Sequence, residues 1–275
     1  MLAIRRLFER HRPLPEIVAT VSAYQAASAT TGSQAIAEAA GAPPVTIPKV
    51  FAGVSSHGFP VAEPIIATID RYIPAPVEPL PDAWWGDALE FMADIEALIE
   101  SEIQDAGRSA SQVEIVNAPD WQNYVRVLVL PSCKRCTVLA GRIYRDLEAF
   151  KRHPQCDCQM WPVQDWEQAH DAGLISSPQE AFDKGAIRDL TIAETQAIND
   201  GADITKVINS SRGIYTADVF GHRVKATTES TTKRAAWRRA NPTRLVRLRP
   251  EAIYRIARDH EDAIRLLRLY GYLTP

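Results

Sequence analysis

The amino-acid sequence predicts a mainly α-helical protein with a small central β-hairpin that carries a zinc site, an α+β fold with few strands. Three observations lead to this prediction. Apolar residues recur at helical spacing over residues 16–40 and again over 82–106. A run rich in β-formers follows at 124–130. All four cysteines of the 275-residue chain then fall between positions 133 and 158.

The first predicted helix covers residues 16–40 and is rich in alanine. Gly41 and Pro43 end it, because glycine favours a helix C-terminus and proline cannot continue the helix. Small side chains along this helix suit close packing against another helix. Its predicted apolar stripe consists of Ile17, Val21, Tyr24 and either Ala27 or Ser28.

Residues 43–81 contain nine of the nineteen prolines and are predicted to form a spacer of extended segments and short turns. Asp82 is predicted to cap the next helix, which ends at Gly107. Its predicted apolar stripe consists of Leu89, Met92, Ile95 or Glu96, Ile99 and Ile103. Trp84 and Trp85 are expected to anchor the start of this helix in the core, with a binding role as the alternative.

The strand predicted at 124–130 ends at Pro131, and residues 141–144 can return beside it as a second strand. Cys133 and Cys136 would then lie in the connecting turn. The following loop would supply the second group of cysteines. This arrangement resembles the knuckle of zinc ribbons and treble clefs.

The cysteines have the spacing of zinc ligands. Cys133 and Cys136 form the first pair, and the second group consists of His153, Cys156 and Cys158. Zn²⁺ in structural sites takes four nitrogen or sulfur ligands, commonly from two close-spaced pairs. Five candidates therefore compete for four positions; the first pair and His153 are favoured, with one of the last two cysteines completing the shell. A closed shell leaves no position for water or substrate, so the ion would be structural.

Disulfides and unrelated free thiols are the alternatives to zinc. Residues 1–10 are too short and too charged for a secretory signal, which disfavours disulfides. A zinc site would imply a reducing, intracellular setting. No run of 18 or more apolar residues is present, so no membrane span is predicted.

The sequence contains no recognised catalytic motif. Pro131 with the first cysteine pair is faintly similar to half of a nucleobase-deaminase site, but no histidine is followed two positions later by glutamate. Zinc-protease, phosphate-loop, nucleophile-elbow and dinucleotide-binding patterns are also missing. We therefore expect that the protein is not an enzyme.

Helices are predicted after Ser177, over 190–199 and over 203–208, with a turn at Gly201. The last two could be mistaken for a DNA-reading helix-turn-helix. Apart from Lys206 the second of them carries almost no basic side chain, so an ordinary packed helical hairpin is the better interpretation.

Charge is distributed unevenly. From His222 onward there are 13 Lys and Arg against 5 Asp and Glu, a net charge of +8, whereas the whole chain has a net charge of −3. Cations in this region could contact DNA phosphates. The candidates are Arg234, Arg238, Arg239, Arg244, Arg247 and Arg249. Alternatively they pair with acidic groups of this protein or of a protein partner.

Several segments match a known family. Around the cysteines they are 107–111 (Gly-Arg-Ser-Ala-Ser), 124–127 (Tyr-Val-Arg-Val), 131–141 (Pro-Ser-Cys-Lys-Arg-Cys-Thr-Val-Leu-Ala-Gly) and 152–158 (Arg-His-Pro-Gln-Cys-Asp-Cys). Further matches lie at 50–53, 58–61, 197–213, 249–254 and 263–268. With these segments the sequence resembles the MuF-like minor head proteins of tailed bacteriophages, and most closely their actinobacteriophage branch.

The resemblance implies a virion component that is made in the host bacterial cytoplasm and associates with the portal vertex during head assembly. Its implied partners are the portal protein, the major capsid protein or both, with packaged DNA as a further partner of the basic region. We expect a structural minor head protein stabilised by zinc. The alternative is a zinc-stapled protein that binds DNA phosphates through its basic C-terminal region, and an enzyme with an unrecognised site is the third class.

Four regions are predicted along the chain. They are an N-terminal helical region (1–42), a proline-rich spacer (43–81), a helix with the zinc-knuckle domain (82–176) and a helical, basic C-terminal region (177–275).

Overall fold

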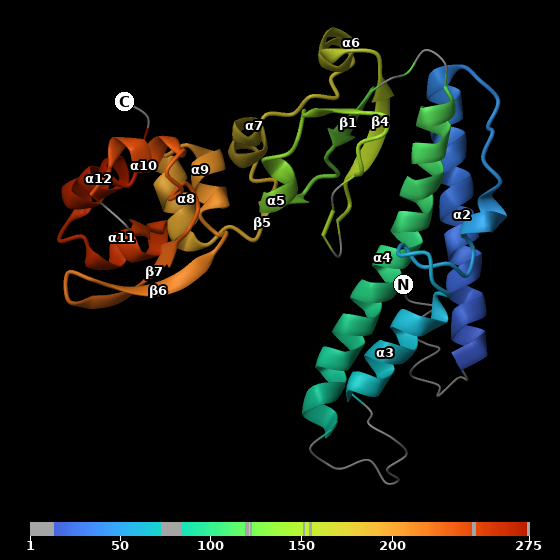
Figure 1. Ribbon diagram of the computed structural model, residues 1–275, viewed down its shortest axis with the longest axis horizontal. Helices are drawn as coiled ribbons and strands as arrows, with labels where there is room; N and C mark the ends of the chain where they lie inside the picture. The colour runs from blue at the N-terminus through green and yellow to red at the C-terminus, as the bar shows by residue number, and fades with distance from the viewer. Residues whose placement is uncertain are drawn as a thin grey trace. The chain divides into compact units, whose positions relative to one another are not determined.

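A computed structural model gives the fold (Figure 1). It describes residues 14–72, 84–118, 121, 123–150, 152–153, 156–243 and 246–273, with only the backbone at 84–87. Helices predominate among these residues and the strands are short, which confirms the predicted mainly α-helical, α+β class. The chain divides into unit 1, Met1–Val129 with Gly141–Ile175, and unit 2, Leu130–Ala140 with Ser176–Pro275. No helix in the described ranges is long and apolar enough to cross a membrane.

Unit 1 is built on two long helices, α2 (Leu14–Ala40) and α4 (Trp84–Asn117), which lie side by side in Figure 1. A third helix, α3 (Ala62–Tyr72), packs against α4. Apolar side chains from all three form one core. Its buried members are Ile17, Val21, Val61, Ile65, Phe91, Ile95 and Ile99.

The predicted apolar stripes are partly wrong. Ile17 and Val21 are buried as predicted, but Tyr24 is 42 % exposed and Gln25 faces the interior instead. In α4, Leu89 is 76 % exposed. Hydrogen bonds explain the inward position of Gln25, because its amide donates to Val54 O at 2.9 Å and accepts from Gly53 N at 2.8 Å.

Helix α4 continues past Gly107 to Asn117, so the predicted helix end at Gly107 is wrong. This glycine instead permits a close crossing of α2 and α4. A Cβ at Gly107 would lie 2.5 Å from Ser28 Oγ, and a Cβ at Gly32 would lie 2.4 Å from Gly107 O. Only residues without a side chain allow the two backbones to approach this closely.

The predicted spacer contains more regular structure than expected. It includes a 3₁₀ turn, η1 (Pro48–Phe51), and the helix α3, whose Ile65 belongs to the core. Helix α3 was not predicted because the prolines of this stretch favour extended segments and turns. Pro60 and Pro64, however, lie at or beside the first turn of α3, where a proline is tolerated. Residues 73–81, Asp82 and the side chains of Trp84 and Trp85 lie outside the described structure.

Three buried polar side chains of α2 and α4 hold the segment between α2 and α3. Glu114 accepts from Val45 N at 3.1 Å and from Thr46 N at 2.8 Å. Glu102 accepts from Ser56 N at 2.7 Å, and Gln25 binds the neighbouring backbone as described above. Burial raises the pKa of Glu114, but these bonds and one from the Ser33 hydroxyl outweigh it and leave the pKa lowered.

A three-stranded antiparallel sheet completes unit 1, in the order β3 (Ile143–Arg145), β1 (Asn123–Val127), β4 (Gln159–Val163). The predicted pairing of the run at 124–130 with 141–144 is confirmed, since Tyr124 pairs with Tyr144 and their rings stack at 5.2 Å. Strand β4 was not predicted. A short helix, α6 (Trp166–Asp171), follows it.

Unit 2 contains short helices around two small sheets. Its helices are α5 (Lys134–Thr137), α7 (Pro178–Asp183), α8 (Ile192–Asn199), α9 (Ile204–Asn209), α10 (Ala236–Ala240), α11 (Pro250–Ile256) and α12 (His260–Leu269). Strands β2 (Ser132–Cys133) and β5 (Ile187–Arg188) pair in parallel. Strands β6 (Ile214–Val219), β7 (His222–Thr227) and β8 (Arg247–Leu248) form an antiparallel sheet in that order.

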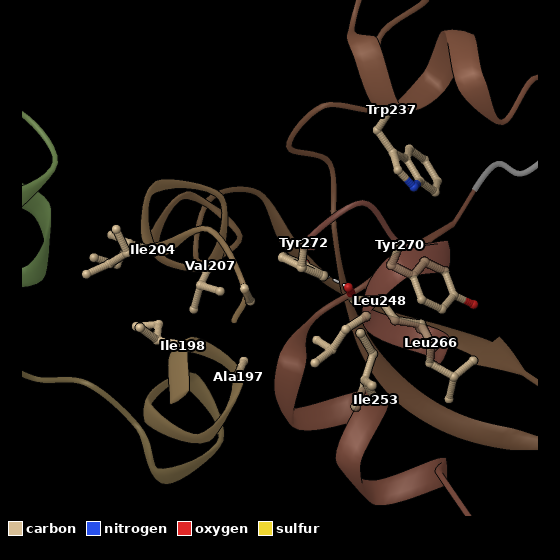
Figure 2. Packing of buried hydrophobic residues seen from close by; sticks show 14 of the residues in the cluster. Ala197, Ile198, Ile204, Val207, Trp237, Leu248, Ile253, Leu266, Tyr270 and Tyr272 are labelled. Atoms are coloured by element: carbon tan, nitrogen blue, oxygen red, sulfur yellow. Dashed lines mark hydrogen bonds between the residues drawn. The ribbon is translucent and has the colours of Figure 1, made fainter. Parts of the chain in front are cut away.

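The predicted helices of this region are confirmed. Ser177 caps α7 by accepting from Glu180 N at 3.0 Å, and α8 and α9 form the helix, turn and helix around Gly201. Figure 2 shows the core that α8 and α9 share with α11, α12 and β8. Within it the hydroxyl of Tyr272 donates to Leu248 O at 2.8 Å, which satisfies its one polar atom.

Candidate metal centre

The five predicted ligands are divided between the two units. Cys133 and Cys136 belong to unit 2, whereas His153, Cys156 and Cys158 belong to unit 1. No disulfide joins any of the four cysteines.

The first pair lies at the start of α5. Cys133 is the N-terminal cap of this helix, and its sulfur accepts a hydrogen bond from Cys136 N at 3.3 Å. The two Sγ atoms lie within 4.8 Å of each other. Cys136 is 2 % exposed, while Cys133 is half-buried. The turn therefore brings both sulfur atoms to one place.

A buried ion pair fixes this turn within unit 2. Lys134 Nζ, between the two cysteines in sequence, lies 2.8 Å from Glu194 Oε2 on α8, and the Glu194 side chain is fully buried. Glu194 also accepts from Thr191 N at 2.9 Å and from the Ser211 hydroxyl at 2.9 Å. Arg249 Nη2 lies 3.6 Å away and adds a second positive charge. These bonds compensate for burying the carboxylate.

The second group lies in the loop before β4. Cys156 N donates to His153 O at 3.2 Å, which closes a turn between these two candidates. The Sγ atoms of Cys156 and Cys158 lie within 4.8 Å of each other, and the residues are 2 % and 1 % exposed. His153 is half-buried.

Two arginines of unit 1 surround the second group. Arg126 on β1 is 1 % exposed, and its Nη1 lies 3.8 Å from Cys156 Sγ. Its guanidinium also stacks on the Phe150 ring at 3.9 Å. Arg108 on α4 donates through Nε to Cys158 O at 3.2 Å and through Nη2 to Cys156 O. Positive charge beside a cysteine favours its thiolate form, the form that binds metal.

The donor chemistry fits a soft metal ion. Within their own units, Cys133 with Cys136 and Cys156 with Cys158 each bring two sulfur atoms within 4.8 Å, and His153 adds an imidazole to the second group. Thiolate and imidazole donors suit zinc and comparable ions, whereas carboxylate-poor sites are unsuited to calcium or magnesium.

Sequence reasoning missed the charged residues that support these groups. Arg126, Lys134 and Glu194 lie in stretches whose secondary structure or motif was recognised, but their burial depends on partners distant in sequence. Lys134 alone carried a signal, since it stands between two candidate ligands.

The six arginines proposed for DNA phosphates do not behave alike. Arg247 is 1 % exposed, donates to Tyr270 O at 3.0 Å and lies over the Tyr272 ring at 4.4 Å. Arg249 is 9 % exposed and lies 3.1 Å from Glu251 Oε1. Both support the interior of unit 2, so their assignment to phosphate contact is corrected.

The other four arginines differ in exposure. Arg234 and Arg239 are exposed, and Arg238 is half-buried and donates to Pro242 O at 2.6 Å. Arg244 lies outside the described residues. Two of the six candidates therefore remain fully open to a ligand in the described structure.

Comparison with known proteins gives one family. The family model described as VG15 protein, a family of viral proteins, matches residues 63–185 of this chain. This range includes all five candidate ligands. The match indicates a phage protein. No curated protein and no solved structure matches the chain.

Proposed function

We propose that this protein is a structural minor head protein of a tailed phage, of the MuF-like kind, that acts in head morphogenesis near the portal vertex. The main support is the similarity to the VG15 family over residues 63–185, because this range contains all five candidate ligands together with α4 and nearly all of α3. The MuF-like segments on both sides of that range add to it. The proposed partners are the portal and major capsid proteins.

The proposal includes one structural zinc ion. Cys133, Cys136 and His153 are its favoured ligands, with either Cys156 or Cys158 as the fourth. Sulfur atoms about 3.8 Å apart form an edge of a tetrahedron around zinc at the usual Zn–S distance of about 2.3 Å. Each cysteine pair already lies within 4.8 Å, so each needs only a small adjustment to bind.

Charge balance supports the same site. Three thiolates and one neutral histidine around Zn²⁺ carry a net charge of −1, and four thiolates carry −2. A buried negative charge requires a compensating partner. Arg126 supplies positive charge beside Cys156 Sγ, and Arg108 brings a second guanidinium to the same loop through its bonds to Cys156 O and Cys158 O.

Metal analysis tests this part of the proposal. Purified protein should contain about one zinc per chain, and Cys136→Ser should lose it and unfold the surrounding segment, because binding to a structural site contributes to folding. His153→Ala should weaken binding, while the exposed His170→Ala serves as the matched control and should leave it unchanged. Protein without zinc and with four titratable thiols would refute the zinc site.

The fourth ligand can be identified by cobalt substitution. Cys156→Ser and Cys158→Ser should differ, because only the variant that removes a ligand changes the sulfur-to-cobalt charge-transfer band. Equal loss in both variants, with no effect of His153→Ala, would instead indicate a four-cysteine site.

The head assignment is tested separately in phage particles. Mass spectrometry of purified virions and procapsids should detect the protein in few copies relative to the shell protein. Its presence in procapsids alone would identify an assembly factor. Its absence from both would refute a role in the head, whatever the metal content.

A second candidate function is phosphate contact by the basic C-terminal region. The exposed Arg234 and Arg239 favour it. Binding to unrelated duplexes should then be equal and should weaken as salt rises, with a log–log slope of about −0.9 per phosphate contact. Arg234→Gln with Arg239→Gln should reduce that slope by about two, and unchanged binding would remove these arginines from the proposal.

A further inference from the structure

The β6–β7 hairpin presents an aromatic side chain at its tip. Val219 pairs with His222, so Phe220 and Gly221 form a two-residue turn. Both have positive φ, 53° and 75°, the pattern of a type I′ turn, which favours Asn, Asp or Gly. A bulky residue in this conformation is strained. Phe220 gains little burial in return, since it is 68 % exposed.

Cations lie on the outer face of the same hairpin. Side chains alternate along β7, so that Val224 and Ala226 are buried while Arg223 and Lys225 are exposed. Arg255 of α11 is also exposed, and its guanidinium donates to Arg223 O. Figure 1 shows the hairpin running beside α11 within this unit.

This face carries little negative charge. Arg223 pairs across the strands with Asp218, and Lys225 pairs with Thr216, whose hydroxyl lies 3.3 Å from Lys225 Nζ. In the described hairpin two cations, Arg223 and Lys225, therefore share the outer face with one carboxylate, while Arg255 lies beside Arg223 and the exposed Phe220 ring stands at the tip. A polyanion whose repeating units also have flat apolar faces complements these cations and the exposed aromatic ring.

We propose that the β6–β7 hairpin is a DNA-binding element. Phe220 stacks on a base, and Arg223, Lys225 and Arg255 contact the phosphates beside it. The strained turn holds the Phe220 ring away from the protein surface, so that a base can reach the ring. This role explains why the strained conformation is kept. The proposal deepens the second candidate function with a different set of residues and does not depend on zinc.

Fluorescence anisotropy with the full chain and a short labelled DNA, single-stranded or duplex, tests the proposal. Phe220→Asn should weaken binding about tenfold, since one stacked base contributes about 1–3 kcal/mol. The same variant should unfold at equal or higher urea concentration, because asparagine tolerates positive φ. Weaker DNA binding without a loss of stability separates a binding role of Phe220 from a structural one. Tighter binding to the single strand would indicate stacking on unpaired bases, and tighter binding to the duplex a wedge between paired ones.

Charge variants and controls complete the experiment. Arg223→Gln and Lys225→Gln should each reduce the salt slope by about 0.7–0.9. Ile214→Thr, at the opposite end of β6, and Arg268→Gln, exposed on α12, should leave binding unchanged.

Three results would overturn the proposal. One is no binding to either DNA at low salt. Another is binding that Phe220→Asn leaves intact while Arg234→Gln with Arg239→Gln abolishes it, which would leave the second candidate function standing without the hairpin. The last is competition by poly-glutamate as effective as that by unlabelled DNA, which would indicate an acidic protein partner.

Discussion

Replacing Gly32 by alanine is expected to destabilise unit 1, although alanine is the better helix former. The added Cβ would lie 2.4 Å from Gly107 O and 2.8 Å from Ser111 Oγ. A serine hydroxyl can rotate away, but the carbonyl belongs to the backbone of α4. The two helices must therefore separate locally, which disturbs the packing around the crossing.

The magnitude follows from two opposing effects. Alanine in place of glycine stabilises a helix interior by about 1 kcal/mol. Overpacking a close contact costs about 1–3 kcal/mol, and a backbone contact that cannot rotate away belongs at the upper end. The net expectation is a loss of about 2 kcal/mol for Gly32→Ala.

Gly107→Ala provides the matched comparison. Its nearest new contact is the Ser28 hydroxyl at 2.5 Å, followed by Ser28 O at 3.1 Å. The hydroxyl can move, so an overpacking cost of about 1 kcal/mol roughly cancels the gain in helix propensity. Adding Ser28→Ala to this variant should raise its stability, because it removes the closest atom.

Urea denaturation followed by far-ultraviolet circular dichroism measures both variants, since α2 and α4 contribute most of the helix in unit 1. A lower midpoint for Gly32→Ala than for Gly107→Ala is expected, with an unchanged slope. If Gly32→Ala is as stable as the wild type, the close crossing does not constrain the helix pair and the reasoning fails.

Two further predictions concern buried charges in unit 2. Glu194→Gln should lower the unfolding free energy by about 3 kcal/mol, because it leaves Lys134 without its buried counter-charge; an unchanged urea midpoint would show that the pair contributes nothing. Hydrogen bonds from Arg258 and Arg265 lower the pKa of Asp262 from 3.8 to about 2. Since the folded pKa is depressed, this stabilisation is present above about pH 4 and is lost as the pH falls toward 2. Asp262→Asn should therefore flatten the stability curve in that range, which denaturation at several pH values measures; a curve as steep as that of the wild type would contradict it.

Local patterns allowed much of the fold to be predicted. The helix α2, the β1–β3 pairing, the Ser177 cap and the α8–α9 hairpin each depend on residues close in sequence. The class of the fold follows from these elements. The cysteine spacing likewise identified residues that could hold a metal ion without any tertiary information.

The remaining features depend on contacts between distant residues. Gly107 has the sequence character of a helix end, and only the approach of α2 at Gly32 reveals its actual role. Gln25 rather than Tyr24 faces the interior, because its side chain accepts a hydrogen bond from Gly53 N in the loop. Helical periodicity cannot show such a partner. Arg247 belongs to the basic C-terminal region, and nothing in the sequence shows that its side chain is buried and donates to Tyr270 O.

The loop between α2 and α3 has a further consequence for motion. Its surface carries large apolar side chains, including Val45, Ile47, Val50 and Phe59, each more than half exposed. The amide protons of Val45, Thr46, Gly53 and Ser56, however, are bound by Glu114, Gln25 and Glu102 from within the helix pair. These four amides should therefore exchange with solvent slowly for a surface loop, because exchange requires their bonds to the helix pair to open.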